Sequence, residues 1–268
     1  MTDTPRILQW SDDEWLQATE VLQAGARAVD AAMAVIPPHA RRLGELGWTM
    51  PVNEYPEFPV LLLYHVAPED LDAAFLRLYA MDDGVRFAHL SRDLIGAPEL
   101  RRWHPLLAQC LAAYVRGDYL VAVPALLAVY EGALAAVVDR PHDTRPRQLA
   151  GDELAAADRN LERILWASID GFTTRLFGSS TFAGNPPPAL NRHWVLHGRD
   201  EPRWGQADCL RLLQALQTLG AARLLAKRDL SVVLRNPDLA ALLKSLPPAR
   251  PGDQGLPPAG ASETDPVS

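Results

Sequence analysis

The chain has 268 residues, of which 48% are hydrophobic and 22% charged, enough for one large domain or two modest ones with a substantial core. Its 33 acidic residues outnumber its 26 basic ones, and the net charge of −7 excludes a surface that is basic all over while leaving room for a local basic groove. Two cysteines are too few for a disulfide scaffold, a zinc finger or an iron–sulfur site.

Two observations concern the cellular compartment. No stretch approaches the roughly 20 uninterrupted apolar residues of a membrane span, so we expect no contact with a membrane. The N-terminal sequence MTDTPRILQWSDDEW is acidic and polar, unlike a signal or transit peptide. We therefore expect a cytoplasmic protein whose two cysteines, Cys110 and Cys209, are inert thiols on apolar helical faces.

The composition favours helices, because Ala, Leu and Arg dominate and apolar alternation of period two is nearly absent. The first predicted helix begins at a capping box formed by Ser11 and Glu14 and runs to about Ile36, where Pro37-Pro38 ends it. The next segment, residues 44–66, is rich in proline and aromatic residues, and we interpret it as ordered but irregular.

The helical pattern continues to residue 246 and strengthens after residue 98. Pro98 and Gly117 mark the first turn and the end of one helix, which Pro105 should kink or split. The following helix, 118–140, is apolar almost all round, which is typical of a buried helix. The predicted helices after residue 66 span 68–80, 84–94, 98–117, 118–140, 152–177, 189–198, 207–228 and 237–245.

The C-terminal residues 247–268 differ from the rest, because Pro and Gly fill 9 of these 22 positions. Such a composition buries too little apolar surface to offset chain entropy, so it predicts a disordered tail. The sequence therefore predicts an all-α antiparallel helical bundle at 96–246, preceded by an N-terminal helical extension at 1–95 that includes the irregular segment.

The densest polar cluster spans residues 191–199 and contains Asn191, Arg192, His193 and His197. A histidine can accept a proton from a ribose 2′-hydroxyl and donate one later, while a guanidinium can hold the scissile phosphate. Arg192 and His197 would lie about 140° apart on a regular helix, so they converge only if Arg192 lies in a frayed first turn or a second subunit completes the groove. Metal-independent cleavage of RNA is thus one interpretation of the cluster.

Two other interpretations stay open. His193 and His197 lie four residues apart and could share a metal ion, although Trp194 stands where metalloproteases have glutamate and no third ligand is near. Alternatively, Arg192 and His197 are structural, capping backbone groups or pairing with a buried acid. Glu131 is the candidate acid, because it lies in the most apolar helix and a buried carboxylate needs a partner.

Two segments between residues 98 and 228 resemble the HEPN superfamily of bacterial helical proteins. They are AYVRGDYLVAVPALLAVYEGAL, with Glu131-Gly132, and LNRHWVLHGRDEPRWGQADCLRLLQAL, with the Arg-x4-His-Gly pattern at Arg192 and His197. The family commonly has a polar residue, often Asn, directly after the Arg, whereas here His193 follows it and Asn191 precedes it.

The resemblance implies an antiparallel bundle that forms a homodimer, with Arg and His of each subunit lining a shared cleft. It implies metal-independent endoribonuclease activity without a cofactor, often in toxin–antitoxin or anti-phage systems, with RNA and an antitoxin or defence protein as partners. His197 would then be the general base or acid, Arg192 the phosphate clamp, Asn191 and His193 auxiliary groups, and Glu131 an orienting residue. Many members of the superfamily are instead non-catalytic binding or dimerisation modules, which is the alternative function.

Overall fold

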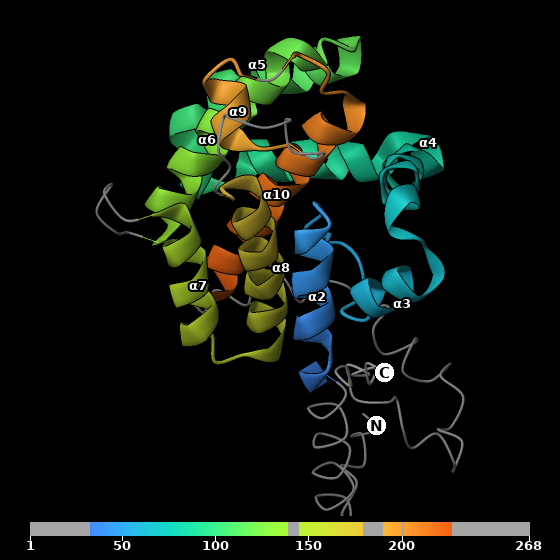
Figure 1. Ribbon diagram of the computed structural model, residues 1–268, viewed down its shortest axis with the longest axis vertical. Helices are drawn as coiled ribbons and strands as arrows, with labels where there is room; N and C mark the ends of the chain where they lie inside the picture. Colours follow the sequence, from blue (N-terminus) through green and yellow to red (C-terminus); the bar gives the residue numbers. More distant parts are fainter. Residues whose placement is uncertain (1–32, 139–144, 179–189, 200, 227–268) are drawn as a thin grey trace, which may run out of the picture. The chain divides into compact units, whose positions relative to one another are not determined.

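The computed structural model describes residues 33–138, 145–178, 190–199 and 201–226 (Figure 1). Its helices are α2 (Ile36–Glu45), α3 (Phe58–His65), η1 (Pro68–Asp70), α4 (Leu71–Gly96), η2 (Pro98–Trp103), α5 (His104–Arg116), α6 (Tyr119–Val138), α7 (Pro146–Ala156), α8 (Asn160–Leu176), α9 (Arg192–Leu196) and α10 (Gln206–Ala226). The described residues contain no strand, which confirms the all-α class. The predictions for residues 11–32, 237–245 and 247–268 concern parts of the chain outside the described residues.

Several helix boundaries follow the sequence signals. Pro105 lies in the first turn of α5, and the predicted helix at 98–117 is split into η2 and α5. Gly117 ends α5 in the left-handed conformation, with a φ of 84°. The predicted helix at 68–80 corresponds to η1 and the first arm of α4, and the predicted helix at 84–94 corresponds to the second arm of α4. The two arms are separated by non-helical residues from Met81 to Gly84.

Two boundary predictions were wrong, and a third was right as far as it went. Met33 and Ala34 are helical and Val35 is a turn, so a helix ends close to the predicted end at Ile36, and Pro37-Pro38 then lies in the first turn of a new helix, α2, where proline lacks only an amide that has no partner. The supposedly irregular segment contains α3, whose first turn holds Pro59. The helix predicted from Asp152 is two helices, because Pro146 opens α7 and extended residues near Arg159 separate it from α8.

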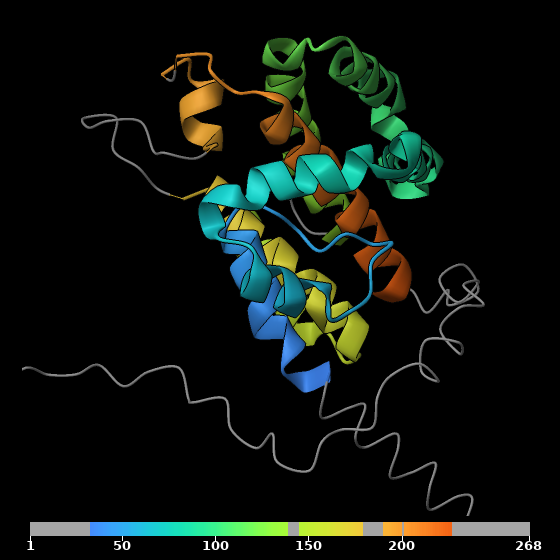
Figure 2. The same ribbon diagram turned by 90° about the vertical axis from the view of Figure 1, so that its right-hand side faces the viewer.

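Residues on both sides of position 95 contribute to one hydrophobic core. Helix α2 packs along α8 and α4 packs against α10, as Figures 1 and 2 show from two sides. The segment after α2 is tied to α8 and α10 by polar contacts. The Ser168 hydroxyl accepts from the Met50 amide at 3.1 Å, and the hydroxyls of Thr49 and Thr218 lie 2.9 Å apart. The described part of the N-terminal region is therefore integral to the core.

Helix α6 packs against α5, α7 and α10, while Leu120 and Val121 near its beginning stay exposed. Among the described residues it is the one helix long and apolar enough to cross a membrane, so the expectation that no such stretch exists was wrong. A buried core helix passes the same test of length and composition. Its buried side chains include Val123, Leu126, Leu127, Tyr130 and Leu134. Packing within the chain thus accounts for much of its apolar surface.

Candidate functional site

The candidate site is built on α9, a helix of five residues whose beginning is fixed by Asn191. The Asn191 side-chain oxygen accepts hydrogen bonds from the amides of His193 at 3.0 Å and Trp194 at 3.3 Å. Its Nδ2 donates to the Gly178 carbonyl at 3.0 Å. Asn191 is itself buried, so its polar groups serve the backbone of α9 and of the residues after α8.

Arg192 is the first residue of α9 and turns toward α6. Its Nε and Nη2 both donate to Oε2 of Glu131, at 3.0 and 2.8 Å. Its guanidinium carbon lies 5.9 Å from the centre of the Phe177 ring. The sequence left Arg192 and His197 open as partners of Glu131, and in the structure its partner is Arg192. The side chains are 27% exposed for Arg192 and 35% for Glu131, so the ion pair lies at the surface and remains in contact with water.

The two histidines meet at the other end of this short helix. Their rings are 4.5 Å apart between centres and nearly perpendicular, at 72°. His197 is exposed and directly follows α9, and Gly198 reverses the chain after it with a φ of 61°. The structure thus brings Arg192 together with Glu131, and His193 together with His197.

The metal-binding interpretation finds no further ligand. Among residues 33–138, 145–178, 190–199 and 201–226, no group of three or more His, Cys, Asp or Glu side chains could hold a metal ion. A tetrahedral protein site for zinc needs at least three such ligands. His193 and His197 therefore form a pair without a third ligand in the described part of the chain.

Two groups of residues were missed in the sequence. The first is an ion-pair network in which buried Arg211 Nη2 lies 2.6 Å from Oδ1 of the exposed Asp72, which also accepts from Trp48 Nε1 at 2.9 Å. It joins α4 to α10, and residues 139 positions apart carry no sequence signal of contact. The second is an apolar groove between α3 and α4, which the uniformly apolar sequence FPVLLLYH could have suggested, because such a short helix cannot bury every side.

Comparison with protein families, with curated proteins and with solved structures finds no match for this chain.

Proposed function

We propose that the chain is a HEPN-like, metal-independent endoribonuclease in which Arg192 binds the scissile phosphate and His197 transfers protons. One observation carries this proposal: Arg192 is oriented by Glu131 yet 27% exposed, and exposed His197 follows the same five-residue helix. A guanidinium fixed at the surface is suited to bind a phosphate, and an exposed imidazole can exchange protons with a substrate.

The reaction would proceed by attack of a ribose 2′-oxygen on the adjacent phosphorus. His197 accepts the 2′-hydroxyl proton as the new P–O bond forms, and the bond to the 5′-oxygen breaks. The departing 5′-oxygen takes up a proton, which leaves a 2′,3′-cyclic phosphate and a 5′-hydroxyl. His193, whose ring contacts that of His197, is the auxiliary group that can donate this proton.

Arg192 would stabilise the negative charge that grows on the phosphate. A guanidinium has five N–H donors, and the contacts with Glu131 use Nε and Nη2. The Nη1 hydrogens are then available for a phosphate oxygen. Glu131 positions the guanidinium and also opposes the approach of a second anion, so Arg192 must balance two negative charges during the reaction.

The expected oligomeric state and biological setting rest on the resemblance of the sequence to the HEPN superfamily. A homodimer would bring two such helices to one cleft, and the biological setting would be cytoplasmic toxin–antitoxin or anti-phage defence with a neutralising or activating protein partner. The acidic net charge of −7 requires the RNA-binding surface to be local, since binding by counterion release depends on clustered cations.

A second candidate function, a non-catalytic interaction or dimerisation module, is favoured by a specific observation. The Arg192–Glu131 ion pair also attaches α9 to α6, and this alone would explain both residues. In that case the cluster at 191–199 shapes a surface for a protein partner, and no chemistry occurs there.

Cleavage of RNA in the presence of EDTA separates the two functions. We expect the wild-type chain to cleave, His197→Ala to lower the rate by about 10²–10⁴-fold, and Arg192→Ala by about 10²–10³-fold. His89→Ala and Arg92→Ala are matched controls, because both residues are exposed on α4, and they should leave the rate unchanged. Circular dichroism should show folded protein for all four variants.

The outcome that contradicts catalysis is equally clear. A wild-type chain that never cleaves RNA, as monomer or dimer, or one that His197→Ala leaves equally active, removes the catalytic proposal. Glu131→Gln adds a readout of positioning. It should lower kcat/KM for RNA while the thermal midpoint of unfolding stays nearly the same. A loss confined to stability favours the interaction module.

A further inference from the structure

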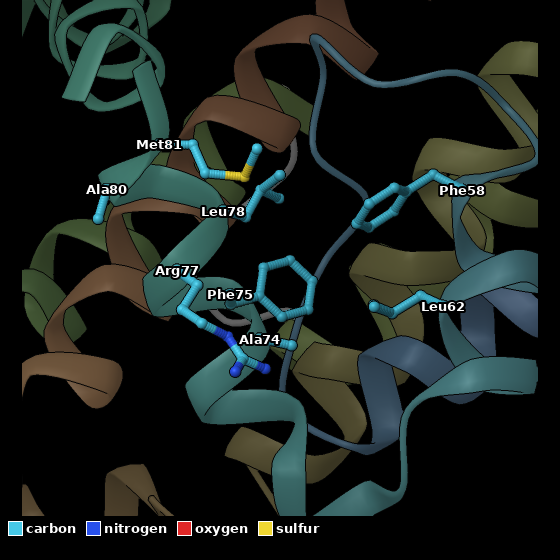
Figure 3. Close-up of a pocket in the computed structure, with 8 residues that line it drawn as sticks. All are labelled: Phe58, Leu62, Ala74, Phe75, Arg77, Leu78, Ala80 and Met81. Atoms are coloured by element: carbon cyan, nitrogen blue, oxygen red, sulfur yellow. The ribbon is translucent and has the colours of Figure 1, made fainter. Parts of the chain in front are cut away.

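A groove with a volume of about 520 Å³ lies between α3 and the first arm of α4, away from the α9 site (Figure 3). Its lining residues are Phe58, Leu62, Ala74, Phe75, Arg77, Leu78, Ala80 and Met81. All of them except Arg77 are apolar. The volume lies within the roughly 300–1,000 Å³ of small-molecule binding sites, which are also lined mostly by apolar and aromatic side chains.

The aromatic wall of the groove is held rigidly from behind. The ring of Phe75 stacks on that of Trp48, with centres 4.1 Å apart and planes within 3°. Phe58 meets Phe75 edge to face at 6.1 Å. Trp48 is fully buried and bonded to Asp72, so the stacked pair is anchored in the core. A preformed wall of this kind binds an apolar ligand at little cost in ordering.

The opposite side of the groove is open to solvent. The Met81 side chain is 51% exposed, and it projects over the space between Leu78 and the two residues of α3 in Figure 3. Exposed apolar surface at a concave site is unfavourable in water and marks a surface that a ligand would cover. The groove therefore fits an elongated apolar group that lies between α3 and α4.

Arg77 is the single charged residue of the lining and is exposed. No acidic side chain in the described part of the chain forms an ion pair with it. Asp82 and Asp83 follow Met81 directly, five and six residues after Arg77. The charges along α4 thus favour an anionic head group at Arg77 and disfavour one near Met81.

We propose that this groove binds a free single-chain amphiphile with a carboxylate head, such as a fatty acid. The hydrocarbon chain lies against Phe58, Leu62 and Phe75, and the carboxylate is paired with Arg77. The proposal is independent of ribonuclease activity, because none of these residues belongs to α6 or α9.

The test uses the full chain and laurate below its micellar concentration, followed by titration calorimetry. We expect saturable binding at one site, weakened more than about tenfold by Leu62→Asp and about fivefold by Arg77→Ala. The matched controls are Leu61→Asp, whose 57% exposed side chain is not part of the lining, and Arg92→Ala. Dodecanol should bind the wild type and Arg77→Ala equally, because it has no charge to pair.

A measurement without substitutions guards against variants that fail to fold. The chain has four methionines, and labelled methyl groups would report on each of them by NMR. Laurate should shift the signal of Met81 and leave that of Met50, which is buried at 2% exposure, unchanged.

Four results would overturn the proposal. The first three are absence of saturable laurate binding, equal loss of affinity in Leu61→Asp and Leu62→Asp, and binding only to anionic vesicles. A further one is increased hydrogen exchange of residues 1–32 in Leu62→Asp when the wild type binds no laurate, which would identify the N-terminal segment as the occupant.

Discussion

The contact of α2 with α8 and the attachment of α9 to α6 are two opposite ways to hold a helix. At the first, glycines let two backbones touch: a methyl group added at Gly44 would lie 2.2 Å from the Ser168 carbonyl oxygen. At the second, a five-residue helix is held by the cap of Asn191, by the buried side chains of Trp194 and Val195, and by one ion pair that remains partly exposed. The contact between α2 and α8 has no room for an added atom. The attachment of α9 to α6 instead leaves polar groups at the surface.

This difference separates stability from chemistry within one core. Close packing over a long interface holds the two helices in one rigid arrangement. A short helix with few contacts has little stability of its own, since isolated short helices are marginal in water. The region that offers Arg192 and His197 to solvent is thus a short helix with two buried side chains, Trp194 and Val195, behind it.

The largest effect is expected at the helix contact. In Gly171→Ala the new methyl group would lie 2.2 Å from the backbone oxygen of Arg41 and 3.0 Å from the amide nitrogen of Glu45, so α2 must move away from α8. We expect the free energy of unfolding to fall by about 3 kcal/mol or more, because backbone atoms cannot relax as a flexible side chain does. Urea denaturation followed by circular dichroism measures it.

Gly96→Ala is the matched control. Gly96 is the last residue of α4, has an ordinary φ, and has no atom within 4 Å of the position where a methyl group would be added. We expect a change within about 0.5 kcal/mol. Equal stabilities of the two variants would show that α2 and α8 do not approach each other this closely.

Much of the helical framework could be predicted because its signals are local. Pro98, Gly117 and the apolar sequence of α6 each specify a helix end or a buried helix through neighbouring residues. The errors arose where a proline opens a helix. Pro146 lies in the first turn of α7, six residues before the predicted start at Asp152, and Pro59 lies in the first turn of α3, inside the segment interpreted as irregular.

The candidate site was found in part for the same reason. Polar residues between 191 and 199 are conspicuous in an Ala- and Leu-rich chain, but their orientation depends on distant residues. Glu131 lies 61 positions from Arg192, and the role of Asn191 as the cap follows from its extended backbone, with φ of −129°. The α3–α4 groove was missed because its walls come together only after the chain folds.

The second prediction concerns the two thiols of the core. Burial raises the pKa of Cys110 from 9.0 to about 11 and that of Cys209 to about 12, the latter also through its neighbours Cys110 and Asp208. Because the folded state holds these protons more tightly than the unfolded state, stability is complete below pH 9 and falls as the pH rises toward 11. We expect a loss of about 2–3 kcal/mol over that interval from Cys110.

Denaturant titrations between pH 8 and 11 measure this loss, and Cys110→Ala with Cys209→Ala provides the control. In the double variant the part of the pH dependence due to thiols should disappear. Native protein at pH 8 should react with a thiol reagent only as fast as it unfolds, since both cysteines are buried. Rapid labelling of either cysteine would mean that the core opens at that position.

The smallest global effect, and the most local one, is expected for Asn191→Ala. Loss of the side-chain oxygen leaves the amides of His193 and Trp194 without their cap, and the Gly178 carbonyl loses its donor. We expect about 1 kcal/mol of destabilisation, with hydrogen exchange faster in α9 and unchanged in α8. Asn191→Ser keeps an oxygen suited to capping and should restore slow exchange of the two amides.

Because Asn191 is buried, any fall in RNA cleavage that accompanies Asn191→Ala, and that serine reverses, must act through the position of Arg192 and His197. Unchanged exchange in α9 would instead mean that the ion pair with Glu131 holds this helix by itself.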